Sequence, residues 1–301
     1  MTTRSSRAHG IQLALVIASG IAAPASAQDT CGRAVRLTTQ PERPRRGAIF
    51  VVRVAGVPTT TEVSGRAADE VLHFSRENSG ARVSFAPAPI DSVSLAVSVE
   101  CTAGASRDTL RLTLSLAQGA YPVERLRVAP RFSASPDSAL AARQQREAAR
   151  AAQVSVVAHQ TPRLWTSPFV PPRAARITSR FGGAREFNGT ITSRHMGTDY
   201  AGAVGAPVRA ANRGIVRLVD EFFLGGKVVY VDHGEGLVTA YLHLSKHRVA
   251  VGDTVERGMV LGQVGATGRV TGPHLHFIAR YGAVTVDPHS VFELTRRETV
   301  R

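Results

Sequence analysis

The chain has 301 residues and a formal net charge of +14, with 43% hydrophobic and 20% charged residues. This composition lies in the range of folded globular proteins, so it excludes an intrinsically disordered chain and a protein made mainly of membrane-spanning segments. Because one hydrophobic core usually serves roughly 100 to 200 residues, the length predicts two folded domains.

The N-terminus has the pattern of a signal peptide over residues 1–27. Arg4 and Arg7 precede an apolar run at 11–23, and the Ala-Ser-Ala sequence at 25–27 supplies small residues for cleavage. The apolar run is shorter than the roughly 20 residues that span a bilayer, which disfavours the alternative of a transmembrane anchor. We therefore expect a soluble periplasmic or secreted protein with no transmembrane segment.

Export also limits the partners that the positive charge can serve. Nucleic acid is a poor partner for an exported protein, so we expect none, whereas the polymers and membrane surfaces outside a cell are anionic and attract a basic chain. Nearly all of the basic residues are arginines, and they are spread along the sequence. Genome composition is therefore an equal explanation for the charge.

The only two cysteines, Cys31 and Cys101, bracket the first predicted domain. An oxidising compartment allows such a pair to persist as a disulfide. Sequence separation alone does not show whether the two Cα atoms come within bonding distance, so two buried free thiols are the alternative. We predict the disulfide in the exported protein, because no other cysteine competes for either partner.

Residues 28–118 contain short runs of alternating or β-branched residues with glycine and proline between them. This spacing predicts a small antiparallel β-sandwich of the immunoglobulin-like kind, and its one histidine, His73, is predicted to be structural. We see no group of residues in this segment with the spacing of a catalytic or metal-binding site. The runs are at 49–54 (IFVVRV), 82–85 (RVSF), 92–97 (SVSLAV) and 110–114 (LRLTL).

Residues 119–172 are predicted to form a linker with one helix. Ser135 can cap this helix and Pro136 can occupy its first turn, after which Ala, Arg and Gln dominate to about Gln153. The helix has little apolar stripe. A solvated spacer is therefore expected, with packing against the following domain as the alternative.

Residues 173–292 are predicted to form an all-β domain with tight glycine corners, followed by a C-terminal tail at 293–301. Seven of the ten histidines fall within this domain. The domain is therefore the place to look for a chemical site.

Two patterns in this domain carry groups that bind metals. In 273–277 (PHLHF), strand alternation places His274 and His276 on one face. In 195–200 (HMGTDY), His195 and Asp199 are four residues apart and share a face of an extended chain. Each pattern alone is common among ordinary surface residues. Together, His195, Asp199 and His276 supply two nitrogens and one oxygen, and three protein ligands that leave a position for water are typical of catalytic zinc.

A third pattern is 241–245 (YLHLS), where alternation predicts that Tyr241, His243 and Ser245 share one face and the two leucines the other. A lone histidine in such a strand is usually structural. Here it lies in the same small domain as the two metal-binding patterns. His243 is therefore a candidate for a histidine that acts beside the metal without binding it.

These motifs resemble the LytM or lysostaphin-type zinc endopeptidases of peptidoglycan over residues 174–292. The resemblance implies that His195, Asp199 and His276 bind one Zn²⁺ per chain and that His243 and His274 are catalytic. It also implies an antiparallel β groove as the fold, and peptidoglycan as the substrate. The matching segments are 178–182 (TSRFG), 195–199 (HMGTD), 205–208 (GAPV), 232–234 (DHG), 241–245, 265–268 (GATG), 272–277 (GPHLHF) and 287–288 (DP).

The resemblance also bears on which bond is cut and on the remaining histidines. It favours the D-alanine to diaminopimelate cross-link in a Gram-negative type of wall, with glycine bridges as the less favoured alternative. The family pattern has no role for His233, His247 or His289, so these are predicted to be structural or surface residues.

Two other functions are alternatives to a peptidase. One is a catalytically inactive LytM-fold activator or scaffold of other cell-wall hydrolases, but such proteins lack metal ligands and this chain keeps all five groups. The other is a biotinyl or lipoyl carrier domain, whose hammerhead turn resembles 252–262. Neither Lys227 nor Lys246 has the surroundings of a carrier lysine. The zinc endopeptidase is the function that the sequence favours.

Overall fold

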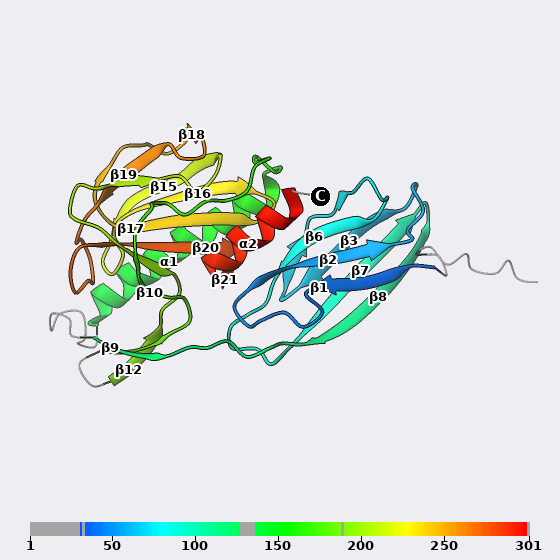
Figure 1. Ribbon diagram of the computed structural model, residues 1–301, viewed down its shortest axis with the longest axis horizontal. Coiled ribbons are helices and arrows are strands. Elements are labelled where there is room, and N and C mark those ends of the chain that lie inside the picture. The colour runs from blue at the N-terminus through cyan, green and yellow to red at the C-terminus, as the bar shows by residue number, and fades with distance from the viewer. Residues whose placement is uncertain (1–30, 32–33, 127–135, 188–189, 300–301) are drawn as a thin grey trace, which may run out of the picture.

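The computed structural model describes residue 31 and residues 34–126, 136–187 and 190–299 of the chain. The predicted signal peptide at 1–27 lies outside the described residues. The described residues are mainly β and form two assemblies of strands that lie side by side (Figure 1). No helix in these residues is long and apolar enough to cross a membrane.

The first assembly is a sandwich of two four-stranded antiparallel sheets. One sheet has the order β1 (Arg36–Gln40), β2 (Ile49–Ala55), β6 (Arg82–Pro87) and β5 (Ser75–Arg76). The other has the order β4 (Glu70–Leu72), β3 (Glu62–Ala67), β7 (Ser94–Ala103) and β8 (Ser106–Ser115). This is the strand order of an immunoglobulin constant-type sandwich with one strand added to its three-stranded sheet, so the predicted fold is confirmed.

Strand β2 is buried on both faces. Phe50 and Val52 point into the core between the two sheets. Ile49 and Val51 point the other way, into an apolar cluster formed mostly by the second assembly. An almost continuous apolar run is expected where both faces of a strand are covered. The sandwich is therefore packed directly on the C-terminal part of the chain.

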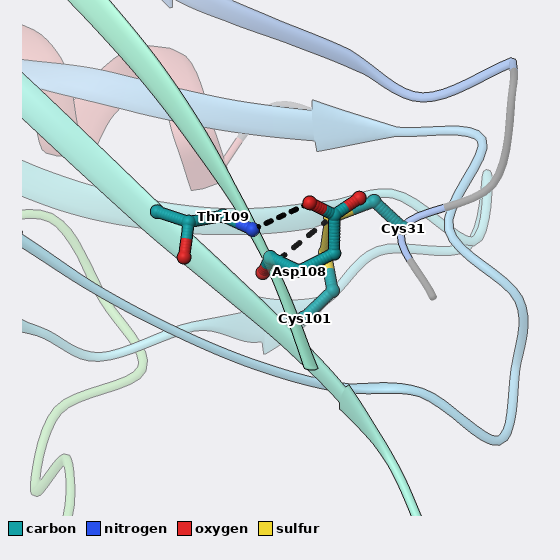
Figure 2. The surroundings of a disulfide bond; sticks show 4 residues. All are labelled: Cys31, Cys101, Asp108 and Thr109. Atoms are coloured by element: carbon teal, nitrogen blue, oxygen red, sulfur yellow. Dashed lines mark hydrogen bonds between the residues drawn. A yellow bond between two sulfur atoms is a disulfide. The ribbon is translucent and has the colours of Figure 1, made fainter. Parts of the chain in front are cut away.

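A disulfide joins Cys31 to Cys101 (Figure 2). Cys101 lies on β7, and Cys31 precedes β1 in the opposite sheet. The two Cα atoms are 5.2 Å apart, within the usual range for a disulfide. The predicted pairing is confirmed, and the bond ties the start of the sandwich to its other sheet.

The connecting segment contains β9 (Val123–Leu126) and α1 (Ser138–Gln160). Helix α1 is capped by Asp137, whose side chain accepts from the Leu140 amide at 2.8 Å. The predicted start near Ser135 and end near Gln153 are therefore both corrected. The helix continues past Gln153 because Val154 and Ala158 extend an apolar stripe that packs on the C-terminal sheet. Of the two alternatives, packing rather than a solvated spacer is observed.

The C-terminal assembly is built on a ten-stranded antiparallel sheet, with one face on α1 and the other on the apolar cluster shared with the sandwich. Its path runs through β10 (Ile177–Ser179), β13 (Thr198–Ala201), β20 (His274–Tyr281), β17 (Leu237–His247), β16 (Gly226–Gly234), β15 (Gly214–Phe222) and β18 (Thr254–Val255). Strands β14 (Pro207–Arg209), β19 (Val260–Val264) and β21 (Val284–Val286) complete it.

A small sheet and a second helix complete this part of the chain. Strands β11 (Ala184–Phe187) and β12 (Thr190–Arg194) form a separate small sheet with β9. Helix α2 (Pro288–Thr299) continues through most of the segment predicted as a tail and lies against β2 of the sandwich (Figure 1).

Candidate metal centre

The three predicted metal ligands meet between two neighbouring strands. Asp199 on β13 lies directly opposite His276 on β20, and His195 comes just before β13. Oδ1 of Asp199 is 2.9 Å from Nε2 of His195 and 2.7 Å from Nδ1 of His276, and the two nitrogens are 3.0 Å apart. All three side chains are buried. They form a group able to hold a metal ion, whose donor atoms lie within 4.8 Å of one another.

The imidazole of His195 is oriented by the segment that contains β10. Its Nδ1 lies 2.9 Å from the carbonyl oxygen of Arg180 and 2.7 Å from the hydroxyl of Ser179. A carbonyl oxygen only accepts, so Nδ1 carries the proton and donates to Arg180. Nε2 therefore presents its lone pair to the other donor atoms, which is how an outer hydrogen bond prepares a histidine to bind a metal.

Gly197 gives the ring of His276 the space that it occupies. A Cβ on Gly197 would lie 2.6 Å from the carbonyl oxygen of Phe277 and 2.7 Å from Cε1 of His276. Any larger residue would therefore push the strand or the ring away. Glycine is needed here for close approach, a role that the sequence did not reveal.

His243 and His274 stand beside this group. Nδ1 of His243 lies 2.8 Å from the carbonyl oxygen of Thr267, and Nδ1 of His274 lies 2.8 Å from that of Gly272. Both rings therefore donate from Nδ1 to main chain and keep Nε2 for other partners. The centroid of the His243 ring is 4.9 Å from that of His274 and 5.9 Å from that of His276. The structure thus brings all five predicted site residues together.

The backbone of His243 has an unusual conformation. Its φ is +63°, in a region that non-glycine residues seldom adopt and that is found mostly at functional sites. It lies in a β-bulge, because Tyr241 pairs with Val229 whereas Leu244 pairs with Lys227, which leaves two residues opposite one. The bulge turns the His243 side chain toward His274 and His276.

The same bulge overturns the predicted alternation around His243. Tyr241 and Leu244 lie in the same apolar cluster, whereas Leu242 faces helix α1. The Tyr241 hydroxyl is buried and accepts from the Ala211 amide at 2.8 Å. Tyr241 is therefore a core residue, and the shared polar face predicted for Tyr241, His243 and Ser245 is wrong.

Burial and neighbouring charges set the protonation of the site. Burial raises the pKa of Asp199, but the adjacent His276 and His195 outweigh it and hold that pKa well below its ordinary value. Burial, with His276 and His274 close by, lowers the pKa of His243 to about 3. Asp199 is thus ionised and His243 neutral at pH 7, which are the states that metal binding and proton acceptance require.

An antiparallel sheet that holds a buried His-Asp-His group beside two further histidines is typical of metal-dependent hydrolases. Residues 193–288 match the model of peptidase family M23. The C-terminal part of the chain therefore contains a peptidase M23 domain.

Curated relatives and a solved structure resemble different lengths of the chain. The peptidoglycan DD-endopeptidase ShyC of Vibrio cholerae is 38% identical over 118 residues, which are 38% of this chain and 27% of that protein. The DD-carboxypeptidase/endopeptidase Mpg of Neisseria meningitidis is 44% identical over 97 residues, 32% of this chain and 22% of that protein. The chain thus spans about a quarter of the length of these relatives.

The likeness to the solved structure extends beyond the M23 match. A peptidase M23 from Pseudomonas aeruginosa has a TM-score of 0.65 and 27% identity over 83% of this chain and 95% of its own. The shared fold therefore includes more than the M23 domain.

Proposed function

We propose that this chain is an exported zinc metalloendopeptidase that hydrolyses peptide cross-links of bacterial peptidoglycan. The observation that carries the proposal is the buried group of His195, Asp199 and His276, with two more imidazoles beside it. Two imidazoles and a carboxylate with no thiolate suit zinc. Three protein ligands leave a position for water, as in catalytic rather than structural zinc sites.

Zinc held by these residues would polarise the scissile carbonyl and lower the pKa of a bound water to about 7. His243 and His274 would do the proton work. Each has Nδ1 fixed by a main-chain carbonyl, so each neutral ring can accept a proton at Nε2 from the attacking water and, once protonated there, donate to the oxyanion or pass the proton to the leaving amine. Asp199 would bind zinc as an ionised carboxylate, the form that metal binding requires.

The names of the relatives support peptidoglycan as the substrate. Those from Vibrio cholerae are DD-endopeptidases, and those from Neisseria are DD-carboxypeptidase/endopeptidases. We therefore propose cleavage of the D-alanine to diaminopimelate cross-link. Removal of residues 1–27 takes away two arginines and no acidic residue, so the formal charge of +14 becomes 14 − 2 = +12, and this charge would attract the exported chain to the anionic wall polymer. No observation favours an inactive scaffold, since all five groups are assembled.

Cleavage of defined muropeptides tests the proposal. The zinc-loaded protein is incubated with a diaminopimelate-type cross-linked dimer and, separately, with a glycine-bridged dimer, and the products are weighed by mass spectrometry. We expect monomers from the first substrate only. A chelator should stop the reaction, added zinc should restore it, and Asp199→Ala should bind no zinc. Intact substrates after incubation with folded, zinc-loaded protein would reject the proposal.

A further inference from the structure

The main chain of His195 is held by the two residues Gly182 and Gly183. The His195 amide donates to the carbonyl oxygen of Gly183 at 2.7 Å, and the Gly182 amide donates to the carbonyl oxygen of His195 at 2.7 Å. The imidazole is held by the same segment, since Nδ1 pairs with Arg180 and Ser179. A shift of residues 179–183 would therefore move His195 relative to Asp199 and His276.

Gly182 in turn packs against the ring of Tyr121, which comes from the connecting segment. A Cβ on Gly182 would lie 2.2 Å from Cδ1 of Tyr121, and its φ of +91° also favours glycine. The Tyr121 hydroxyl donates to the carbonyl oxygen of Arg46 in the sandwich. Tyr121 thus reaches from the sandwich to the backbone that holds His195.

Further contacts hold the same segment against the sandwich. Phe181 is buried, and its Cε1 lies 2.5 Å from where a Cβ on Gly47 would be. Cδ1 of Ile90 is 3.1 Å from the Cβ position of Gly182. Arg194 also pairs with Asp91 at 3.0 Å, but both side chains are well exposed, so this ion pair contributes little. The apolar contacts therefore carry the connection.

We propose that Tyr121 is a positioning residue for His195 and that the sandwich, through Tyr121, fixes the geometry of the metal centre. The proposal rests on the proposed function, because it takes His195 to be a zinc ligand. Tyr121 acts only through Gly182 and touches neither metal nor substrate. Parallel pairing of β9 with β11 holds the residues after Tyr121 beside the same segment.

Zinc affinity of tyrosine variants in the whole chain tests the inference. Tyr121→Ala should weaken zinc binding, measured by competition with a chelator, by about 10-fold to 100-fold, the usual effect of losing a group that orients a ligand. Tyr121→Phe keeps the ring over Gly182 but loses the hydrogen bond to Arg46 that ties the ring to the sandwich, so its zinc affinity should lie between those of the wild type and Tyr121→Ala. Hydrogen exchange at the Gly182 and His195 amides should be faster in Tyr121→Ala, even where the variant is only partly stable.

Tyr230→Ala is the matched control. Tyr230 is a buried tyrosine of the C-terminal sheet that packs near α1. Its loss should therefore lower the stability of the protein and leave its zinc affinity unchanged. If Tyr121→Ala binds zinc as tightly as the wild type and its Gly182 and His195 amides exchange at the wild-type rate, the positioning role of Tyr121 is wrong. The proposed function is unaffected by that result. If the wild-type chain binds no zinc, the proposed function fails and the inference fails with it.

Discussion

His243 and His274 are oriented by the same device, a hydrogen bond from Nδ1 to a main-chain carbonyl. Neither lies in the group of three donor atoms. We therefore predict that His243→Ala and His274→Ala each keep zinc and lose turnover by about 100-fold to 10,000-fold, the usual contribution of a positioned acid-base group. Metal content and the rate of muropeptide cleavage are measured on the same preparation.

His247→Ala on the same strand is the control for these two variants, since His247 lies outside the site and should keep full activity. A folded His243 or His274 variant without zinc would have to be reassigned as a ligand variant. If both variants cleave muropeptides at near-normal rates, the two-histidine mechanism is wrong, even if the three zinc ligands are assigned correctly.

The burial of His233 leads us to predict that the protein loses folding stability in mild acid. His233 is fully buried, with Nδ1 2.7 Å from the carbonyl oxygen of Arg213 and Nε2 2.8 Å from the Thr239 hydroxyl, and burial lowers its pKa to about 4. In the unfolded chain its pKa is about 6.5, so between these values the unfolded state binds more protons. The stabilisation is complete above pH 6.5 and is lost as the pH falls to about 4, on the order of 3 kcal/mol in all.

Urea unfolding of the wild type and of His233→Gln across this range checks the prediction. The variant should be less stable than the wild type at pH 7, but its free energy of unfolding should fall less steeply below pH 6.5. Parallel curves for the two proteins would show that His233 does not cause the acid sensitivity.

Several residues of the site could be placed from sequence, and others could not. Alternation placed His274 and His276 on one face because β20 is regular there, with Leu275 and Phe277 buried behind them. The orienting roles of Ser179, Thr267 and Gly197 depend on contacts with residues distant in the sequence or on space for a ring. No local pattern could assign those roles.

At the scale of elements, sequence alternation predicts which face a side chain takes where strand pairing is regular. That prediction is wrong where the pairing is irregular. The bulge at Leu242-His243 changes the face on which the following side chains of β17 lie. It is recognised only from the residue pairing of β17 with β16. The end of helix α1 predicted near Gln153 is too early, because the helix follows its buried residues Val154 and Ala158, whose packing on the sheet no local pattern shows. Tertiary packing on the sheet decides both cases.

The disulfide belongs to the scale of elements, because it joins the segment before β1 to β7. It closes a loop with a sequence separation of 70 residues, for which loop entropy predicts a stabilisation of about 4 kcal/mol. We expect the double variant Cys31→Ser, Cys101→Ser to lose about 2 to 4 kcal/mol in denaturant unfolding. Adding a reductant should weaken the wild type to a similar extent and leave the double variant unchanged, and equal stability of oxidised wild type and variant would contradict the expectation.

At the scale of the whole molecule, the sandwich and the M23 domain share one apolar cluster. Ile49 and Val51 of β2 and Val83 and Phe85 of β6 lie in it with Trp165 and Phe169 and with residues of α2. The ring of Phe85 stacks on that of Trp165 with centroids 6.0 Å apart. The described parts of the chain therefore pack as one body, and we expect the sandwich to contribute to the stability of the M23 domain without supplying a catalytic group.

Truncation tests this sharing of a core. A fragment that begins at Trp165 lacks α1 and the four sandwich residues of the shared cluster, so it uncovers the sheet face under α1 and part of that cluster. A fragment that begins at Asp137 keeps α1 and uncovers only the part of the cluster that Ile49, Val51, Val83 and Phe85 cover. Each large apolar side chain that loses its cover costs about 1.5 to 3 kcal/mol, and a whole domain has only about 5 to 15 kcal/mol of stability.

We therefore expect stability to fall in the order whole chain, Asp137 fragment, Trp165 fragment, as measured by thermal unfolding, with the Trp165 fragment largely unfolded or aggregated. Zinc affinity of the Asp137 fragment should also fall, because that fragment lacks Tyr121 and the contacts that hold Gly182. A Trp165 fragment with the melting temperature and zinc affinity of the whole chain would show that the M23 domain needs neither cover, and the shared cluster would then be a contact without energetic weight.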